Sequence, residues 1–203
     1  MGFGHIYVNA DPPRIAAAIE GHLRTKGFAR IPMTPEHHPR RMKEIREDRL
    51  RLFWLSPRQG RWTGLFEFRY YSNEARDRWG YADEHLALAL SRELGEVWRM
   101  EVLDGAGFWM YAHYVGGEER EGRAYEDTPG GRTTDRSHPR YELNRIIERE
   151  GFPDIGLAYE HIPGPEVAPI EHVPQDPALA GRSPGFMHLA FGRASNGEPE
   201  ADP

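Results

Sequence analysis

The stretch RLFWLSPRQGRWTGLFEFR, residues 51–69, is the strongest indication of fold class in this chain. Its two arms are rich in aromatic and aliphatic residues that alternate with a period of two, which is typical of half-buried strands. The connection between them, residues 56–60, contains a proline and ends in glycine, as the turn of a β-hairpin often does. The sequence therefore predicts an antiparallel strand pair here and an antiparallel sheet around it.

Helices and strands are predicted on both sides of this hairpin from the spacing of their apolar residues. Three segments have helical spacing and end near a glycine: 12–27, 83–94 and 139–150. Four further segments alternate as strands do: 5–9, 97–103, 108–115 and 118–125. The first six elements, βαββαβ, resemble the order of ferredoxin-like domains. We therefore predict an α+β fold, an antiparallel sheet of about five to six strands with about two to three helices, in ferredoxin-like order with an added hairpin strand.

Two segments do not fit this pattern. Residues 29–49 contain three prolines, dense charge and few apolar residues, so we predict a long charged loop there. Residues 163–203 hold eight of the 17 prolines and an excess of acidic residues. The sequence therefore predicts a single α+β domain over 1–162, followed by a Pro-rich, acidic and extended C-terminal tail over 163–203.

Composition argues against several classes of protein. The 203 residues include 0 Cys, which excludes disulfides, a thiolate zinc site and a cysteine nucleophile. The chain has neither a run of about 18 apolar residues nor a signal-peptide pattern, so we expect a cytoplasmic protein without a membrane partner. A formal net charge of −6 makes nucleic acid an unfavourable partner, because that binding depends on neutralising phosphates.

The ten histidines do not form a metal-binding motif. His37 and His38 are adjacent, so their side chains point in different directions on a helix or on a strand. No His-Glu-x-x-His sequence is present, and neither a Gly-x-Ser-x-Gly elbow nor a complete phosphate-binding loop occurs. We therefore predict no metal site and no cofactor.

Charged residues on the predicted strands form the first candidate for catalysis. Glu67 and Glu101 alternate with apolar neighbours on their strands, and Arg69 and Arg99 have the same parity. If the two strands are neighbours, one face of the sheet carries all four side chains. Such a face is either a general acid–base site or, as is more common, a cross-strand ladder of ion pairs.

The strand GFWMYAHYV, residues 107–115, supplies the second candidate. Trp109, Tyr111 and His113 share one face, and the other face is also apolar or aromatic, so the strand is expected to be central. An aromatic sheet face with a histidine at its edge suits a small ligand. We take Glu67, Glu101 and His113 as catalytic candidates.

The segment RYYSNEARDRWGYADEH, residues 69–85, is the candidate for partner binding. It interleaves aromatic rings with arginines, which are the residue types that dominate binding hot spots. The alternative is a loop that folds back over its own sheet and completes the core. The residues predicted to contact a partner are Tyr70, Tyr71, Arg76, Arg78, Trp79 and Tyr81.

Two functions remain open. The first is a non-catalytic protein–protein interaction module, such as an adaptor, an inhibitor or immunity-type protein or an assembly subunit, with a protein partner or a homo-oligomer bound by the aromatic–arginine loop and the tail. The second is a small-molecule-binding protein or an acid–base enzyme on the aromatic sheet face. A carboxylate within about 3 to 5 Å of His113, in a concave pocket, favours the second. A flat aromatic patch around Trp79 favours the first.

Overall fold

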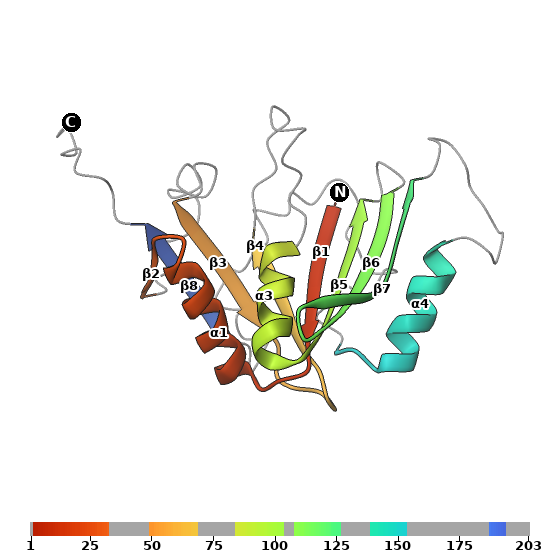
Figure 1. Ribbon diagram of the computed structural model, residues 1–203, viewed down its shortest axis with the longest axis horizontal. Helices are drawn as coiled ribbons and strands as arrows, with labels where there is room; N and C mark the ends of the chain where they lie inside the picture. Colours follow the sequence, from red (N-terminus) through yellow and green to blue (C-terminus); the bar gives the residue numbers. More distant parts are fainter. Residues whose placement is uncertain are drawn as a thin grey trace, which may run out of the picture.

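The computed structural model describes residues 2–32, 49–68, 84–103, 108–126, 139–153 and 187–193. Within these residues, three helices accompany one sheet of eight strands (Figure 1). The strands are β1 (Gly2–Val8), β2 (Phe28–Ile31), β3 (Leu50–Leu55), β4 (Thr63–Phe68), β5 (Glu96–Leu103), β6 (Phe108–Val115), β7 (Glu118–Glu126) and β8 (Met187–Arg193). The helices are α1 (Pro12–Arg24), α3 (Glu84–Leu94) and α4 (Pro139–Glu150).

The strands lie in the order β2-β8-β3-β4-β1-β5-β6-β7, and every neighbouring pair is antiparallel. The predicted hairpin pairs β3 with β4, with Leu55 opposite Leu65. The α+β fold with an antiparallel sheet is therefore confirmed. The predicted number of about five to six strands is wrong, because the sheet has eight. The ferredoxin-like order is not confirmed for this larger sheet.

The two additional strands come from the segments predicted as loop and tail. Residues Met187–Arg193 form β8, which lies between β2 and β3 and buries Leu189 and Phe191. The Phe191 ring meets the Phe53 ring edge to face at 5.8 Å. Strand β2 has only four residues, too few for a clear alternation, and it takes the first residues of the predicted loop into the sheet. Residues 33–48, like the rest of the tail, lie outside the described residues.

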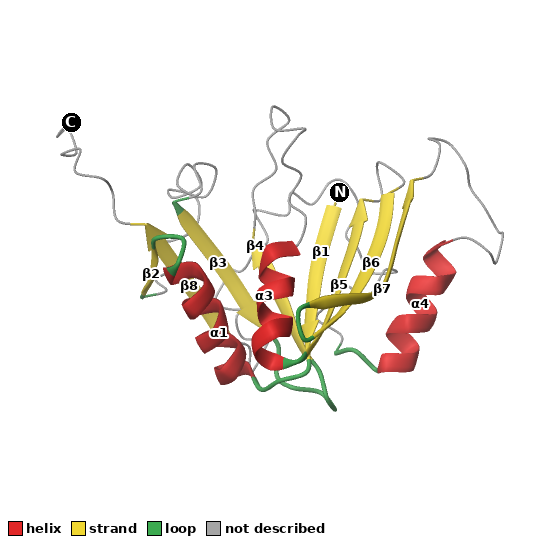
Figure 2. Ribbon diagram, in the orientation of Figure 1, coloured by secondary structure: helices red, strands yellow, loops and turns green. Residues whose placement is uncertain are grey.

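One face of the sheet is covered by α1 and α3, which Figure 2 shows in front of the strands. Helix α1 starts with prolines at its first two positions, where no backbone N–H is needed, and ends before Gly27. Its buried stripe of Ile15, Ile19 and Leu23 recurs at a spacing of four and packs in the main core with residues such as Val8. In each strand, every second side chain points to this face.

The opposite face carries a second, aromatic core beneath α4. This core contains Tyr7, Trp62, Trp98, Met100, Tyr111, Leu143, Ile146 and Phe152. Phe152, just after α4, stacks on Tyr7 with ring centroids 4.1 Å apart, and Trp62 Nε1 donates a hydrogen bond to the Glu150 carbonyl at 3.0 Å. Strand β6 is therefore covered on both faces, whereas the charged strand β7 forms an edge of the sheet.

Among the described helices, the longest has 13 residues, and none has the length and apolar character needed to cross a membrane.

Candidate small-molecule site beside α4

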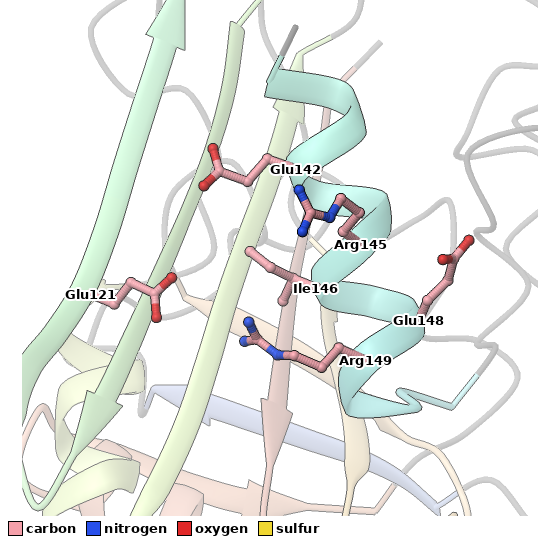
Figure 3. Close-up of a pocket in the computed structure, with 6 residues that line it drawn as sticks. All are labelled: Glu121, Glu142, Arg145, Ile146, Glu148 and Arg149. Atoms are coloured by element: carbon pink, nitrogen blue, oxygen red, sulfur yellow. The ribbon is translucent and has the colours of Figure 1, made fainter. Parts of the chain in front are cut away.

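A cleft of ≈ 560 Å³ lies between α4 and the outer strands of the sheet (Figure 3). Its volume is within the range of about 300–1,000 Å³ that is usual for small-molecule sites. The residues that line it are Glu121 from β7 and Glu142, Arg145, Ile146, Glu148 and Arg149 from α4.

Helix α4 presents this lining because its sequence is amphipathic. Leu143 and Ile146 are buried against the sheet, and they fix the rotation of the helix. Arg145 and Arg149 are four residues apart, so they share one side of α4. In Figure 3 both extend from the side that faces the strands, whereas Glu148 points away from them.

Glu142 is held in place by residues of the sheet. Its Oε1 accepts a hydrogen bond from the Tyr111 hydroxyl at 2.9 Å, and its Oε2 lies 3.4 Å from Nη1 of Arg123. Burial, followed by the hydrogen bond to the Glu142 carboxylate, raises the pKa of Tyr111 well above its ordinary value. Tyr111 therefore remains a neutral hydrogen-bond donor that ties α4 to β6.

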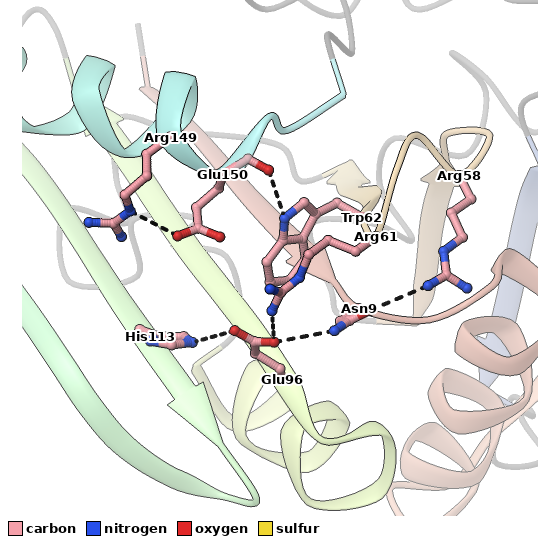
Figure 4. Close-up of polar contacts among 8 residues, drawn as sticks. All are labelled: Asn9, Arg58, Arg61, Trp62, Glu96, His113, Arg149 and Glu150. Carbon is pink, nitrogen blue, oxygen red and sulfur yellow. Dashed lines mark hydrogen bonds and ion pairs between the residues drawn. The ribbon is translucent and has the colours of Figure 1, made fainter.

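His113 lies on the same face of the sheet and forms a dyad with Glu96 (Figure 4). Its Nε2 is 3.1 Å from Oε1 of Glu96, and its ring stacks on the Trp98 indole at a centroid distance of 4.2 Å and an angle of 5°. The side chains of His113 and Glu96 are 17% and 23% exposed. The imidazole is thus oriented by two contacts but is still accessible.

The position of Glu96 follows from the junction between α3 and β5. Gly95 adopts a φ of 104°, a left-handed conformation that ends the helix and starts the strand at the next residue. The other carboxylate oxygen of Glu96, Oε2, accepts a hydrogen bond from Asn9 Nδ2 at 3.2 Å and pairs with Arg61. These contacts hold the carboxylate against His113.

The His113–Glu96 dyad lies beside the cleft, although neither residue is among those that line it. His113 is directly opposite Glu121 in the pairing of β6 with β7. The guanidinium of Arg149 lies over the Trp98 ring at 5.8 Å, on the same indole that stacks with His113. A carboxylate bound to Nε2 favours the tautomer with the hydrogen on that nitrogen, which leaves Nδ1 as a proton acceptor. Such a group can act as a general acid or base toward a bound ligand.

The predicted carboxylates Glu67 and Glu101 lie on the other face of the sheet. Ile6 on β1 is paired with Leu65 on β4 and with Arg99 on β5, so these three residues share a face. Alternation along each strand then adds Glu67 and Glu101 to it. Both glutamates thus share one face with Arg99, but β1 lies between β4 and β5, so the two strands are not neighbours as the prediction assumed. Arg69 lies outside the described residues.

Both of these carboxylates are held in buried ion pairs. Arg51 Nη2 lies 2.6 Å from Glu67 Oε1, and Arg99 Nη2 lies 2.7 Å from Glu101 Oε1. The four side chains are between 1% and 6% exposed. His113 is paired with Trp98, which points away from this face. The structure therefore does not bring Glu67, Glu101 and His113 into one site.

Glu96 is the functional candidate that the sequence analysis missed. Only four residues separate the predicted strands 97–103 and 108–115, so their antiparallel pairing, continued from Leu103 opposite Phe108, pairs Trp98 with His113. Glu96 lies two residues before Trp98, so its side chain points to the same face of β5. The pairing of the two strands was therefore the signal that could have placed this carboxylate beside His113.

The residues predicted to contact a partner all fall between 69 and 83, outside the described residues. They are Tyr70, Tyr71, Arg76, Arg78, Trp79 and Tyr81. The protein–protein interaction hypothesis depends on them and on the tail, and it stays a prediction.

Comparison of the chain with known protein families, with curated proteins and with solved structures finds no match. Within the described ranges, no group of three or more His, Asp or Glu side chains has an arrangement that could hold a metal ion.

Proposed function

We propose that this protein binds a small molecule in the cleft beside α4 and that His113, oriented by Glu96, exchanges a proton with the ligand. The observation that carries the proposal is the 3.1 Å contact between His113 Nε2 and Glu96 Oε1 next to a cleft of ≈ 560 Å³. A histidine with a carboxylate at this distance, beside a concave pocket, is the arrangement that favours ligand binding or acid–base chemistry.

The surroundings of the dyad support a functional role. Trp98 is 1% exposed, and its Nε1 is buried without a hydrogen-bond acceptor in the described part of the chain. A buried donor without a partner costs about 1–3 kcal/mol. His5 Nδ1, outside the lining of the cleft, is another such atom, so the Trp98 donor supports a site only together with the dyad and the cleft.

The chemistry available to the dyad is proton transfer. Glu96 holds the imidazole by Nε2, and Trp98 fixes the plane of the ring, so Nδ1 is the nitrogen left for a ligand. Positioned proton transfer contributes a rate factor of about 10²–10⁴ in enzymes. His113 is the group assigned to this step, and Glu96 is a positioning residue.

Ligand-observed NMR with a library of small polar fragments tests the proposal. The wild type is compared with Glu121→Trp, in which the larger side chain fills the cleft from the face of β7 that is turned toward α4. Glu119→Trp is the matched control, because Glu119 lies opposite Tyr114 of the main core and therefore on the other face of β7. We expect a subset of fragments to bind the wild type and the control, to lose binding to Glu121→Trp and to shift the His113 imidazole signals. If every fragment that binds does so equally well to Glu121→Trp, the proposal is contradicted.

For the fold, we propose the ferredoxin-like order for the central part of the sheet alone. In support of this, β3, β4, β1 and β5 are consecutive neighbours, and the helices α1 and α3 that connect them pack in one core.

A further inference from the structure

We propose that the ligand of the α4 cleft is a zwitterion of the amino-acid class, with its carboxylate bound by Arg145 and its ammonium group bound by Glu121. This inference rests on the proposed function, because it names the class of ligand that the same cleft takes.

Side chains of opposite charge face each other across the cleft. Arg145 and Arg149 extend from α4 toward the strands, and Glu121 extends from β7 toward the helix (Figure 3). No ion pair joins the two walls at Glu121 among the described residues, although the side chains face the same space. A ligand that carries both charges can contact both walls at once.

Several of the charged side chains already have partners, which narrows the choice of groups that can bind the ligand. Glu142 is bonded to Tyr111 and Arg123, and Arg149 Nε lies 3.0 Å from Glu150 Oε1. Within the described part of the chain, neither Arg145 nor Glu121 takes part in an ion pair. One guanidinium and one carboxylate, on opposite walls, therefore remain for the ligand.

The charge of the lining disfavours a ligand of one sign. Glu148 points away from the strands, so the charges that face the cleft are two glutamates and two arginines, and a simple anion finds no net positive charge there. A simple cation can pair with Glu121 but must be placed beside two guanidinium groups. Arg145 and Arg149, four residues apart on a helix, also repel each other, and a carboxylate between them relieves this repulsion.

The size and apolar content of the cleft fit a small aliphatic amino acid. Ile146 is the apolar member of the lining and is only 3% exposed because it packs in the aromatic core, so the cleft suits a ligand with a short side chain. Since Glu121 is paired with His113 across β6 and β7, an ammonium group bound by Glu121 lies in the row of the sheet that holds His113. The amino end of the ligand is thus the end nearest to the proton-exchanging group.

A matched set of three probes tests this inference by calorimetry or NMR titration. L-leucine carries both charges, 4-methylpentanoate lacks the ammonium group, and 3-methylbutylamine lacks the carboxylate. Because a charge-assisted hydrogen bond contributes about 1.5–3 kcal/mol, we expect leucine to bind at least about tenfold more tightly than either analogue.

Charge-neutral variants then assign each end of the ligand. Arg145→Gln is expected to reduce leucine binding to the level of the amine, and Glu121→Gln to the level of the carboxylate. Glu119→Gln, on the other face of β7, is expected to leave leucine binding unchanged.

Two results overturn the inference while the proposed function stands. One is equal binding of leucine and 4-methylpentanoate. The other is no binding of leucine, while the fragments that Glu121→Trp excludes still shift His113. Failure of the proposed function has a different signature, since Glu121→Trp then excludes no fragment at all.

Discussion

The imidazole of His113 lies parallel to the indole of Trp98, with ring centroids 4.2 Å apart, while its Nε2 faces Glu96 Oε1 at 3.1 Å. The stack fixes the plane of the imidazole, and the carboxylate fixes its rotation within that plane. Both contacts come from β5, the neighbouring strand, so the register of one hairpin sets the geometry of the dyad.

Replacement of Glu96 by Gln is expected to change the tautomer of His113 without unfolding the protein. The carboxylate can only accept a hydrogen bond, so it selects the Nε2–H form, whereas a carboxamide can both donate and accept. Long-range ¹H–¹⁵N NMR distinguishes the two tautomers directly. We expect one tautomer in the wild type and a mixture in Glu96→Gln. The Nδ1–H form as the main species of the wild type would contradict the assigned role of Glu96.

Phe152→Ala is expected to release α4 from the sheet. The ring is 7% exposed and stacks on Tyr7, so its removal leaves a cavity beneath the end of the helix. Loss of a buried phenylalanine side chain costs about 3–5 kcal/mol in free energy of unfolding. Urea denaturation measures this loss, and Phe152→Leu is the control that retains most of the apolar volume. A loss below about 1 kcal/mol would show that α4 does not depend on this contact.

Stability is expected to fall on acidification because of His5. Burial lowers the pKa of His5 from 6.5 to about 4, and its Nδ1 has no hydrogen-bond partner in the described structure. Below pH 6.5, His5 is therefore protonated in the unfolded chain, whereas in the folded chain it stays neutral down to about pH 4. Above pH 6.5 this difference does not affect the free energy of unfolding. Between pH 6.5 and 4 it lowers the free energy of unfolding progressively, by up to about 3 kcal/mol. Burial also lowers the pKa of His188, which acts in the same direction.

His5→Phe separates this effect from the titration of other groups. The new ring fits between the Tyr7 and Phe66 rings, whose centroids lie 6.3 Å and 6.0 Å from the His5 ring. The stability difference between the variant and the wild type, measured by urea denaturation across this pH range, is expected to grow as the pH falls. A difference that does not change with pH would mean that His5 is not shielded from protons in the folded state.

The ion pair between Arg99 and Glu101 is expected to be structural. Removal of one partner, as in Arg99→Met, leaves a buried carboxylate and costs about 3–5 kcal/mol in free energy of unfolding. The double variant with Glu101→Leu is expected to lose less than Arg99→Met alone, because no buried charge then remains. Fragment binding in the α4 cleft should be unchanged in the double variant. If the double variant folds but no longer binds these fragments, Glu101 contributes to the site and its role is not only structural.

The strands near the hairpin could be predicted because their alternation is local. Residues 51–69 contain both arms and the turn, and β6 shows the two apolar faces of a covered strand. Strand β8 has a similar alternation in Leu189 and Phe191. Its partners β2 and β3 are far away in the sequence, however, and no local pattern indicates such a pairing.

The candidate site could be predicted only in part for the same reason. His113 was identifiable as a histidine on an aromatic strand face. To predict Glu96 as a site residue, the register of β5 against β6 has to be known. To predict the cleft, the position of α4 on the sheet has to be known, and that position depends on contacts such as the one between Trp62 and Glu150. Residue types and parity indicate which side chains share a strand face, but they do not indicate which helix covers that face.

The response of the His113 imidazole to ligands tests the central claim most directly. ¹⁵N NMR signals of His113 are followed during titration with fragments that bind the wild type but not Glu121→Trp. We predict that these fragments shift the Nδ1 resonance while Nε2 keeps its hydrogen bond to Glu96. Fragments that occupy the cleft and leave both nitrogen signals unchanged would contradict the assignment of His113 as the proton-exchanging group.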